Sequence, residues 1–255
     1  LDMRLERRVA IVTGGGSGLG AGIATRFAEE GASLVLADIN GDNVEAVASD
    51  IRGGQSKAIA VEMDVTDYAA AEDLVSRTVA EYGTVDILVN SAGTSKSMSF
   101  LDAKPEEFQH IMKVNLEGTM YCGQHAARVM AAKGYGRIVN IASISGERAG
   151  IGRTGYGVSK FAVIGLTKQM ALELGPQGVN VNAVGPGPVD TPLTRVGHSD
   201  ATREAYLDLI PLGRYGTVEE MADAAAYLAG EQASYVNGHV LFVDGGFVSV
   251  GIQKE

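Results

Sequence analysis

The chain has 255 residues, 45% of them hydrophobic and 20% charged, with 34 glycines, a composition typical of globular α/β proteins and unlike disordered or fibrous ones. Its formal net charge of -10 and the lack of any basic run disfavour nucleic acid as a partner, because binding a polyanion draws on clustered Lys and Arg. The single cysteine, Cys122, excludes an intramolecular disulfide, a thiolate metal site and a CxxC redox pair, so we expect a cytoplasmic location and no bound metal.

The first residues, "LDMRLERRVAIVTGG", enter a strand-like run too early for a signal peptide. No apolar run approaches the roughly 18 residues that would indicate a membrane span. We therefore expect no signal peptide and no membrane partner.

Seven short apolar runs rich in Val and Ile follow one another along the chain, at 8–12, 33–38, 57–64, 85–90, 136–142, 178–184 and 239–246. They are too continuous for strands with one solvated face and indicate strands buried on both faces of a parallel sheet. Segments of helical period lie between them, for example 18–32 and 66–83. This alternation predicts an α/β fold, a doubly wound parallel sheet of about seven strands with helices on both faces, with ligands bound beyond the carboxyl ends of the strands.

No linker or repeat divides the chain, so we expect a single domain over 1–255. The stretch at about 186–216 contains Gly and Pro but no strand-like run. We interpret it as a mobile loop that covers the substrate.

The first strand runs directly into "TGGGSGLG", residues 13–20, where a helical pattern begins. Gly14, Gly18 and Gly20 permit a tight turn and close backbone approach, and the N–H groups at the helix start attract a pyrophosphate. Asp38 ends the second strand and can accept a hydrogen bond from a ribose 2′-hydroxyl. Its carboxylate would repel a 2′-phosphate, and no Arg or Lys stands nearby in the sequence to neutralise one, so NAD is favoured over NADP.

Two further predicted strands end in polar groups suited to a nucleotide. Asp64 and Val65 follow one of them, and Asn90, Ala92 and Gly93 follow the next. Asp and Asn are also frequent in ordinary turns, so these residues by themselves leave both readings open.

Tyr156 and Lys160 are spaced i, i+4, so a helix would place both side chains on one face. An ammonium near a phenol stabilises the phenolate and lowers its pKa, which would make the pair an acid/base. Ser143 follows a buried strand and could hydrogen-bond a substrate oxygen. A solvated Tyr/Lys face is the alternative interpretation.

The motifs "TGGGSGLG", "NSAG" (90–93), "VNLEG" (114–118), "IASISG" (141–146), "YGVSK" (156–160) and "GPGPVDT" (185–191) occur in one order. With them, the sequence resembles the short-chain dehydrogenase/reductase family from about Arg8 to about Gly246. The resemblance implies a Rossmann-type NAD-binding domain. It departs from the family pattern at Ser91, where a second Asn is common, and there we expect a local change in strand hydrogen bonding without loss of cofactor binding.

The resemblance also implies roles for single residues. Tyr156 would exchange the proton with the substrate oxygen, Ser143 would orient that oxygen, Lys160 would lower the Tyr pKa and hold the nicotinamide ribose, and Asn115 would anchor a water that leads protons to solvent. The cofactor-binding residues that it implies are Gly14, Ser17, Gly18, Leu19, Gly20, Asp38, Asp64, Val65, Asn90, Ala92, Gly93, Tyr156, Lys160, Pro186, Gly187, Val189 and Thr191.

Polar residues border the expected substrate pocket, and we select Ser145, Glu147, Arg153 and His198 as substrate-binding candidates. They favour a small hydroxylated or anionic substrate over a steroid or fatty chain, whose site would be mostly apolar. Solvated loop residues are the alternative.

We therefore expect an NAD-dependent oxidoreductase that interconverts a secondary alcohol and a ketone, or a sugar hemiacetal and a lactone, on a sugar, polyol or hydroxy acid. One alternative is a 3-oxoacyl-thioester reductase, which Asp38 and the negative net charge disfavour. Another is a non-enzymatic NAD-binding sensor or interaction protein. The resemblance further implies a homotetramer or homodimer that pairs through the helices at 108–132 and around Tyr156.

Overall fold

The computed structural model describes residues 4–54 and 56–250, and in these residues seven strands form one sheet in the order β3-β2-β1-β4-β5-β6-β7. Every neighbouring pair runs parallel. The strands are β1 (Val9–Thr13), β2 (Ser33–Asp38), β3 (Ala58–Glu62), β4 (Ile87–Asn90), β5 (Gly136–Ile141), β6 (Val179–Pro186) and β7 (Val240–Val243). The predicted doubly wound parallel sheet is confirmed, while both ends of the predicted domain lie outside the described residues.

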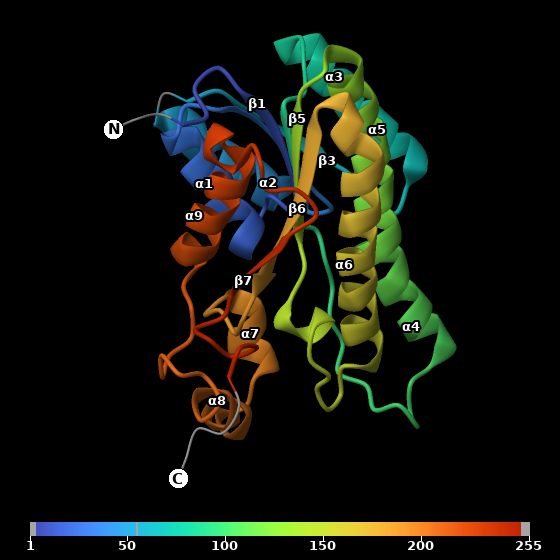
Figure 1. Ribbon diagram of the computed structural model, residues 1–255, viewed down its shortest axis with the longest axis vertical. Coiled ribbons are helices and arrows are strands. Elements are labelled where there is room, and N and C mark those ends of the chain that lie inside the picture. Colours follow the sequence, from blue (N-terminus) through green and yellow to red (C-terminus); the bar gives the residue numbers. More distant parts are fainter. Residues whose placement is uncertain (1–3, 55, 251–255) are drawn as a thin grey trace.

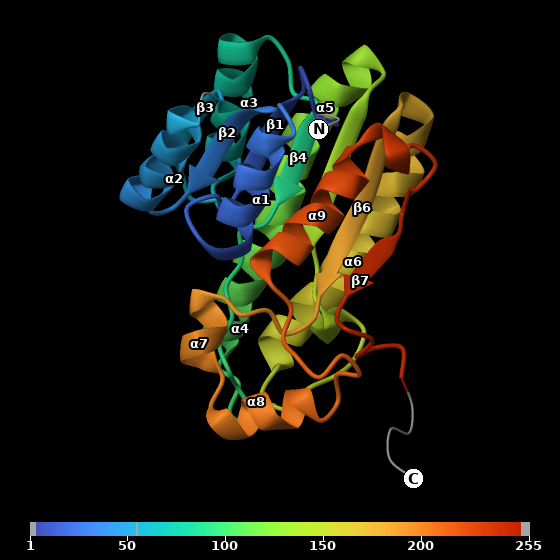
Figure 2. The same ribbon diagram turned by 90° about the vertical axis from the view of Figure 1, so that its left-hand side faces the viewer.

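Helices cover both faces of the sheet (Figure 1). On one face lie α1 (Gly18–Glu29), α2 (Gly41–Gly53) and α9 (Val218–Ala229), and on the other α3 (Tyr68–Tyr82), α5 (Gly118–Lys133) and α6 (Thr154–Leu174). Figure 2 shows α4 (Pro105–Met112), α7 (Pro192–Gly197) and α8 (Asp200–Leu207) gathered beyond the carboxyl ends of the strands. None of the helices that the structure describes is long and apolar enough to cross a membrane.

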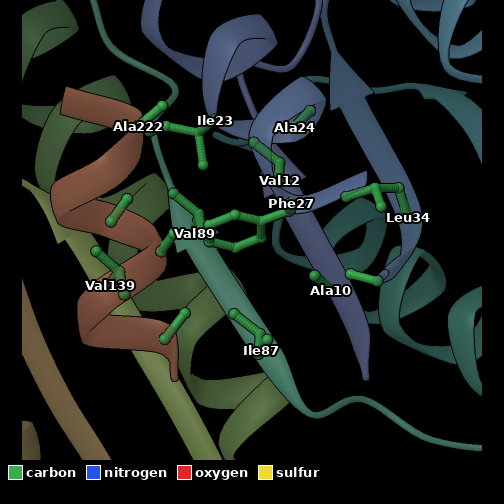
Figure 3. Close-up of a cluster of buried hydrophobic side chains, with 14 of the residues drawn as sticks. Ala10, Val12, Ile23, Ala24, Phe27, Leu34, Ile87, Val89, Val139 and Ala222 are labelled. Carbon is green, nitrogen blue, oxygen red and sulfur yellow. The ribbon is translucent and has the colours of Figure 1, made fainter. Parts of the chain in front are cut away.

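The strand β1 shows why the apolar runs are continuous. Ala10 and Val12 belong to the hydrophobic cluster under α1 and α9, whereas Ile11 belongs to the cluster under α3 and α5. Because successive side chains of a strand point to opposite faces, a strand covered on both sides needs an apolar residue at every position. Figure 3 shows the first cluster, with Phe27 fully buried among β-branched side chains. Cys122 is buried in the second cluster.

The order of the strands fixes where a ligand can enter. The chain passes from β1 outward to β2 and β3 and then returns to place β4 on the other side of β1. Connections leave the carboxyl ends of β1 and β4 in opposite directions, which opens a crevice between them. The glycine-rich loop follows β1 and therefore lies at this crevice.

Three predicted boundaries differ from the structure. The third strand ends at Glu62, because its neighbour β2 ends at Asp38, which is paired with Glu62. The helical segment predicted over 108–132 is α4 and α5 joined by a π-helical turn, Lys113–Glu117. The stretch predicted as a loop over 186–216 contains α7 and α8, because Thr191 and Ser199 cap two helix starts.

Candidate active site

The loop from β1 to α1 consists of three glycines and Ser17, so it brings mainly backbone to the crevice. Gly14 adopts a left-handed conformation with φ 66°, and a Cβ there would lie 2.8 Å from the Ala92 backbone. A Cβ at Gly20 would collide with the carbonyl oxygen of Gly14. Ser17 precedes α1 without capping it through its side chain, so the first N–H groups of the helix, at Gly18 and Leu19, remain available for an anion.

Asp38 stands beside this loop at the end of β2. One carboxylate oxygen accepts a hydrogen bond from the Gly16 N–H at 3.0 Å, and the other accepts one from the Asn40 N–H at 3.0 Å. The backbone thus fixes a partly buried carboxylate one strand away from the glycine loop. This is where the adenosine ribose lies in dinucleotide-binding folds of this type.

The ends of β3 and β4 line the crevice. Thr13 accepts hydrogen bonds from the N–H groups of Ser91 and Ala92 at 3.2 and 3.3 Å, so the main chain at the unusual Ser91 is anchored by β1. Asn90 is buried and donates to the Asn140 side chain at 2.9 Å. Gly93 is exposed.

Val65 is buried after β3, whereas the carboxylate of Asp64 is exposed and accepts from the Thr66 N–H at 2.8 Å. Asp64 therefore also fulfils the turn role that the sequence left open.

The residues at and after the end of β6 also border the crevice. Pro186 is the last residue paired with β7, and a Cβ at Gly187 would lie 2.7 Å from Asp244 Cα. Val189 is buried and bridges to Gly216, and the Thr191 hydroxyl accepts from the Thr194 N–H at 3.3 Å. Helix α7 begins directly after Thr191, so these crevice residues and α7 form one continuous segment.

Ser143, Tyr156 and Lys160 come together at the carboxyl end of β5. Ser143 follows the strand, and its hydroxyl accepts from the Ser145 N–H at 3.0 Å. Tyr156 lies in the first turn of α6 and Lys160 one turn later, with the Lys160 Nζ 5.6 Å from the centre of the Tyr156 ring. Lys160 is buried and donates to the Ile141 carbonyl at 2.7 Å. The predicted helix and the shared face are both present.

The surroundings shift both titrating groups. Burial raises the pKa of Tyr156, while contact with the Ser143 hydroxyl and the positive charge of Arg153 lower it. Burial lowers the pKa of Lys160 to about 8. Ser143 and Arg153 thus counteract the effect of burial on the pKa of Tyr156. The resemblance gives Lys160 the role of lowering this pKa, and that role stays a prediction.

Asn115 sits in the π-helical turn between α4 and α5 and is buried. Its side-chain oxygen accepts from the Thr94 N–H at 2.8 Å, and its amide donates to the Thr94 carbonyl at 3.0 Å and to the Ser159 hydroxyl at 2.9 Å. The wider turn aims this side chain between the loop after β4 and helix α6. Asn115 thereby ties the cofactor crevice to the helix of Tyr156.

Of the four predicted substrate residues, the structure brings Arg153 and His198 together. The Nη2 of Arg153 lies 3.2 Å from the Nε2 of His198, and the His198 Nδ1 lies 3.0 Å from the Tyr215 hydroxyl. Ser145 is buried beside Ser143, whereas Glu147 is exposed.

The sequence analysis did not predict the aromatic residues that lie around His198. Tyr206 stacks on His198 with ring centres 5.3 Å apart, and Phe247 lies 5.8 Å from Tyr206. Tyr206 also raises the pKa of Tyr156 electrostatically, which places it by the reacting end. The two tyrosines within 186–216 were the available signal, since a solvated loop rarely needs large aromatic side chains.

The residues fit a nicotinamide dinucleotide. A backbone cradle in which a Cβ at Gly14 or Gly20 would collide lies next to the fixed carboxylate of Asp38, and both face the crevice at the switch in strand order. Among the residues that the structure describes, no group of His, Cys, Asp or Glu is arranged to hold a metal ion.

Fold and site together define a nicotinamide-dependent oxidoreductase. A family model described as enoyl-(acyl carrier protein) reductase matches residues 14–248, more than half of the chain. The chain belongs to the short-chain dehydrogenase/reductase family, whose members here are named dehydrogenases and reductases acting on CH–OH groups.

Its relatives differ in substrate. It is 38% identical over 246 residues to the 3-oxoacyl-[acyl-carrier-protein] reductase FabG of Thermotoga maritima, with 96% of this chain and all 100% of that protein covered. It is 37% identical over 249 residues to D-threitol dehydrogenase of Mycolicibacterium smegmatis, covering 96% and 95% of the two chains. A crystal structure of gluconate 5-dehydrogenase from Burkholderia cenocepacia, in complex with NADP and tartrate, matches with a TM-score of 0.94, 35% identity and 98% coverage of each chain.

Proposed function

We propose that the protein is an NAD(H)-dependent dehydrogenase that interconverts a secondary alcohol and a ketone, or a sugar hemiacetal and a lactone, on a small polar substrate. The observation that supports this most strongly is the gathering of Ser143, Tyr156 and Lys160 at the carboxyl end of β5, beside the glycine loop. A phenol, a hydroxyl and an ammonium at the mouth of a dinucleotide crevice are suited to proton transfer next to hydride transfer.

In this proposal each residue has one task. When bound, the nicotinamide would supply hydride transfer to and from the substrate carbon. The Tyr156 hydroxyl takes the proton from the substrate alcohol and returns it in the reverse direction, while the Ser143 hydroxyl hydrogen-bonds the same oxygen. Lys160 holds the ribose and favours the phenolate, and Asn115 anchors the route by which the proton reaches solvent. The backbone of Val189 and the Thr191 hydroxyl hold the carboxamide.

The choice of NAD rests on Asp38. Its carboxylate, fixed by two backbone N–H groups, would lie against a 2′-phosphate and repel it, but would accept hydrogen bonds from a ribose diol. One solved relative is in complex with NADP and another, a 7α-hydroxysteroid dehydrogenase, with NADH, so the choice of cofactor depends on the Asp38 side chain.

The proposed substrate class rests on the polar wall of Arg153 and His198 and on relatives named for threitol and gluconate. Reduction of 3-oxoacyl thioesters is the second candidate, favoured by the FabG relative. The net charge of -10 opposes it, because an acidic carrier protein calls for a basic docking surface. We propose that the segment at 186–216, with α7 and α8, closes over either substrate.

We also propose a homotetramer or homodimer in the cytoplasm. A groove between α5 and α6 is lined by apolar and polar residues of both helices, among them Met120, Ala127, Leu166 and Met170. A second copy of the same two helices would offer the matching surface, as expected for an isologous interface.

The reaction is tested with purified protein, NAD and a panel of polyols, sugars, hydroxy acids and 3-hydroxyacyl thioesters, following NADH absorbance. We expect turnover of a small polar member, and we expect Tyr156→Phe to lower kcat by at least about 1,000-fold while NADH binding, measured by fluorescence titration, stays within about twofold. Retained turnover in Tyr156→Phe would show that the phenol is not the acid/base. Turnover of the thioesters alone would establish the second candidate.

A further inference from the structure

Arg153 is held at the reacting end of the site by the backbone of its own loop. It precedes α6 directly, three residues before Tyr156. Its N–H donates to the Gly150 carbonyl at 3.2 Å, its carbonyl accepts from the Gly157 N–H at 2.6 Å, and it bridges to Met98 of the loop after β4. The guanidinium carbon lies 5.6 Å from the centre of the Tyr156 ring. The backbone of Arg153 is therefore anchored at the start of the helix that carries Tyr156.

The side-chain partners of Arg153 are both neutral groups. Nη1 lies 3.3 Å from the Ser95 hydroxyl and Nη2 lies 3.2 Å from His198 Nε2. For Nε2 to accept from a guanidinium, His198 must be neutral with its proton on Nδ1, which then donates to Tyr215. Burial and the charges of Arg153 and Arg203 lower the pKa of His198, which favours this neutral form. Because both ring nitrogens are engaged, His198 positions Arg153 and offers no free nitrogen to substrate.

In the described part of the chain no carboxylate forms an ion pair with Arg153, and nearby carboxylates are already paired with other cations. Asp190 accepts from Arg195 at 3.1 Å and from Arg203 at 3.5 Å. Glu107 pairs with Lys96 at 2.5 Å. A half-buried guanidinium without a counter-ion is costly unless a ligand supplies the negative charge.

The remaining donors of Arg153 match one chemical group. A guanidinium has five N–H donors in one plane, and Ser95 and His198 engage two of them. The three that remain suffice for a bidentate contact with a carboxylate. Tyr206 and Tyr215 pack against the His198 ring and Phe247 lies against Tyr206, so the Arg153–His198 pair stands beside an aromatic cluster that contains no carboxylate.

We infer that the substrate carries a carboxylate, that Arg153 binds it, and that Arg153 thereby determines specificity for hydroxy acids and their oxo acids over uncharged alcohols. The inference rests on the proposed function and narrows its substrate class. Since the guanidinium lies one helical turn from Tyr156, only a few bonds separate the carboxylate from the carbon that reacts.

Matched pairs of an acid and the corresponding alcohol test this: lactate and 1,2-propanediol, 3-hydroxybutyrate and 1,3-butanediol, gluconate and sorbitol, tartrate and threitol, with glycerol 3-phosphate added. Each is assayed with NAD and with NADP. We expect the best substrate to be a carboxylate whose kcat/KM exceeds that of its alcohol partner at least 100-fold. Arg153→Gln should lower the ratio of kcat/KM for the acid to kcat/KM for the alcohol roughly 30-fold, mainly by raising KM for the acid, whereas the loss of its charge beside Tyr156 affects both substrates alike.

Further variants separate the effect of the Arg153 charge on substrate binding from an effect on folding. Arg153→Lys should restore part of the loss, since it keeps the charge without the fork. Arg77→Gln removes an exposed arginine on α3, paired with Asp73, and should change neither substrate. Thermal melting of each variant shows whether it is folded.

Three outcomes overturn the inference while leaving the proposed function intact: an uncharged alcohol as best substrate, glycerol 3-phosphate as best substrate, or equal losses for acid and alcohol in Arg153→Gln. A panel with no turnover by either cofactor contradicts the proposed function instead. In that case tartrate still tests the site, because it should raise the melting temperature of the parent protein with NADH but not of Arg153→Gln, and equal shifts or none overturn the role of Arg153.

Discussion

Two cations lie 5.6 Å from the centre of the Tyr156 ring, and they differ in what they cost the fold. Arg153 is half-buried and ends in a guanidinium, which is more weakly hydrated than an ammonium and so loses less on leaving water. Lys160 is buried with a pKa lowered to about 8, so near neutral pH the folded state contains a charge that water would solvate better. We therefore expect the charge of Lys160 to lower the free energy of unfolding of the protein.

Lys160→Met should abolish turnover and stabilise the protein in a pH-dependent way. Between the ordinary pKa of 10.5 and about 8 the difference is worth about 3 kcal/mol, reduced by the donor that the Ile141 carbonyl loses. The folded pKa is lowered, so the penalty is complete below pH 8 and disappears as the pH rises towards 10.5. The melting temperature of the variant minus that of the parent should thus fall between pH 7 and pH 10.

Thermal melting at several pH values checks this, with Lys168→Met as control. Lys168 is exposed on the same helix, so its removal should give no such trend. A difference in melting temperature that stays constant from pH 7 to pH 10 would mean that Lys160 does not titrate in this range.

Asp38→Ala should change cofactor preference. Removing the carboxylate removes both its repulsion of a 2′-phosphate and its contact with the ribose diol, so the ratio of kcat/KM for NADP to that for NAD should rise at least about tenfold. Asp50→Ala, which removes an exposed acid of α2 outside the predicted cofactor contacts, serves as control. An unchanged ratio would remove the reason for choosing NAD.

At this scale the sequence predicted the close placement of Ser143, Tyr156 and Lys160 because they belong to short motifs in which local structure sets the geometry. It did not predict that His198 binds Arg153 or that Tyr206 stacks on His198. Arg153 and His198 are 45 residues apart in the sequence, and the stacking of Tyr206 on His198 depends on how α8 returns over the site.

At the scale of elements, the turn from β1 into α1 depends on the absence of side chains. Gly20→Ala should weaken NADH binding at least tenfold, because its Cβ collides with the Gly14 carbonyl and must displace the backbone that faces the pyrophosphate. Gly53→Ala, at the exposed end of α2 where a Cβ meets nothing within 4 Å, should leave binding unchanged. Fluorescence titration with NADH measures both, and equal affinities in the two variants would contradict the close-approach argument.

The elements also show where pattern reading ends. Apolar periodicity located the strands, since burial on both faces leaves a clear mark in the sequence. The π-helical turn at Asn115 left none, because it arises from hydrogen bonds of Asn115 to Thr94 and Ser159, both distant in sequence. The helices α7 and α8 are 6 and 8 residues long, which is too short for a periodic signal. The Thr and Ser residues that cap them were the only sequence features that indicate their starts.

At the scale of the whole molecule, α5 and α6 cover one side of the sheet and leave the groove between them facing outward. If this groove is the subunit interface, Leu166→Glu should dissociate the assembly, because a carboxylate would lose its hydration and replace an apolar contact. Light scattering after size exclusion measures the mass, with Lys168→Glu on the same helix as control outside the groove. An assembly of unchanged mass in Leu166→Glu would place the interface elsewhere.

The buried Cys122 has a practical consequence. Its side chain is 1% exposed on α5, and burial raises the pKa of its thiol to about 12, so neither access nor thiolate is available in the folded state. As the chain contains no other cysteine, a chromogenic thiol reagent has a single target. Under excess reagent the colour develops only as fast as the α5 side of the core opens. The rate of colour development therefore measures the kinetic stability of the native chain without labels or engineered probes.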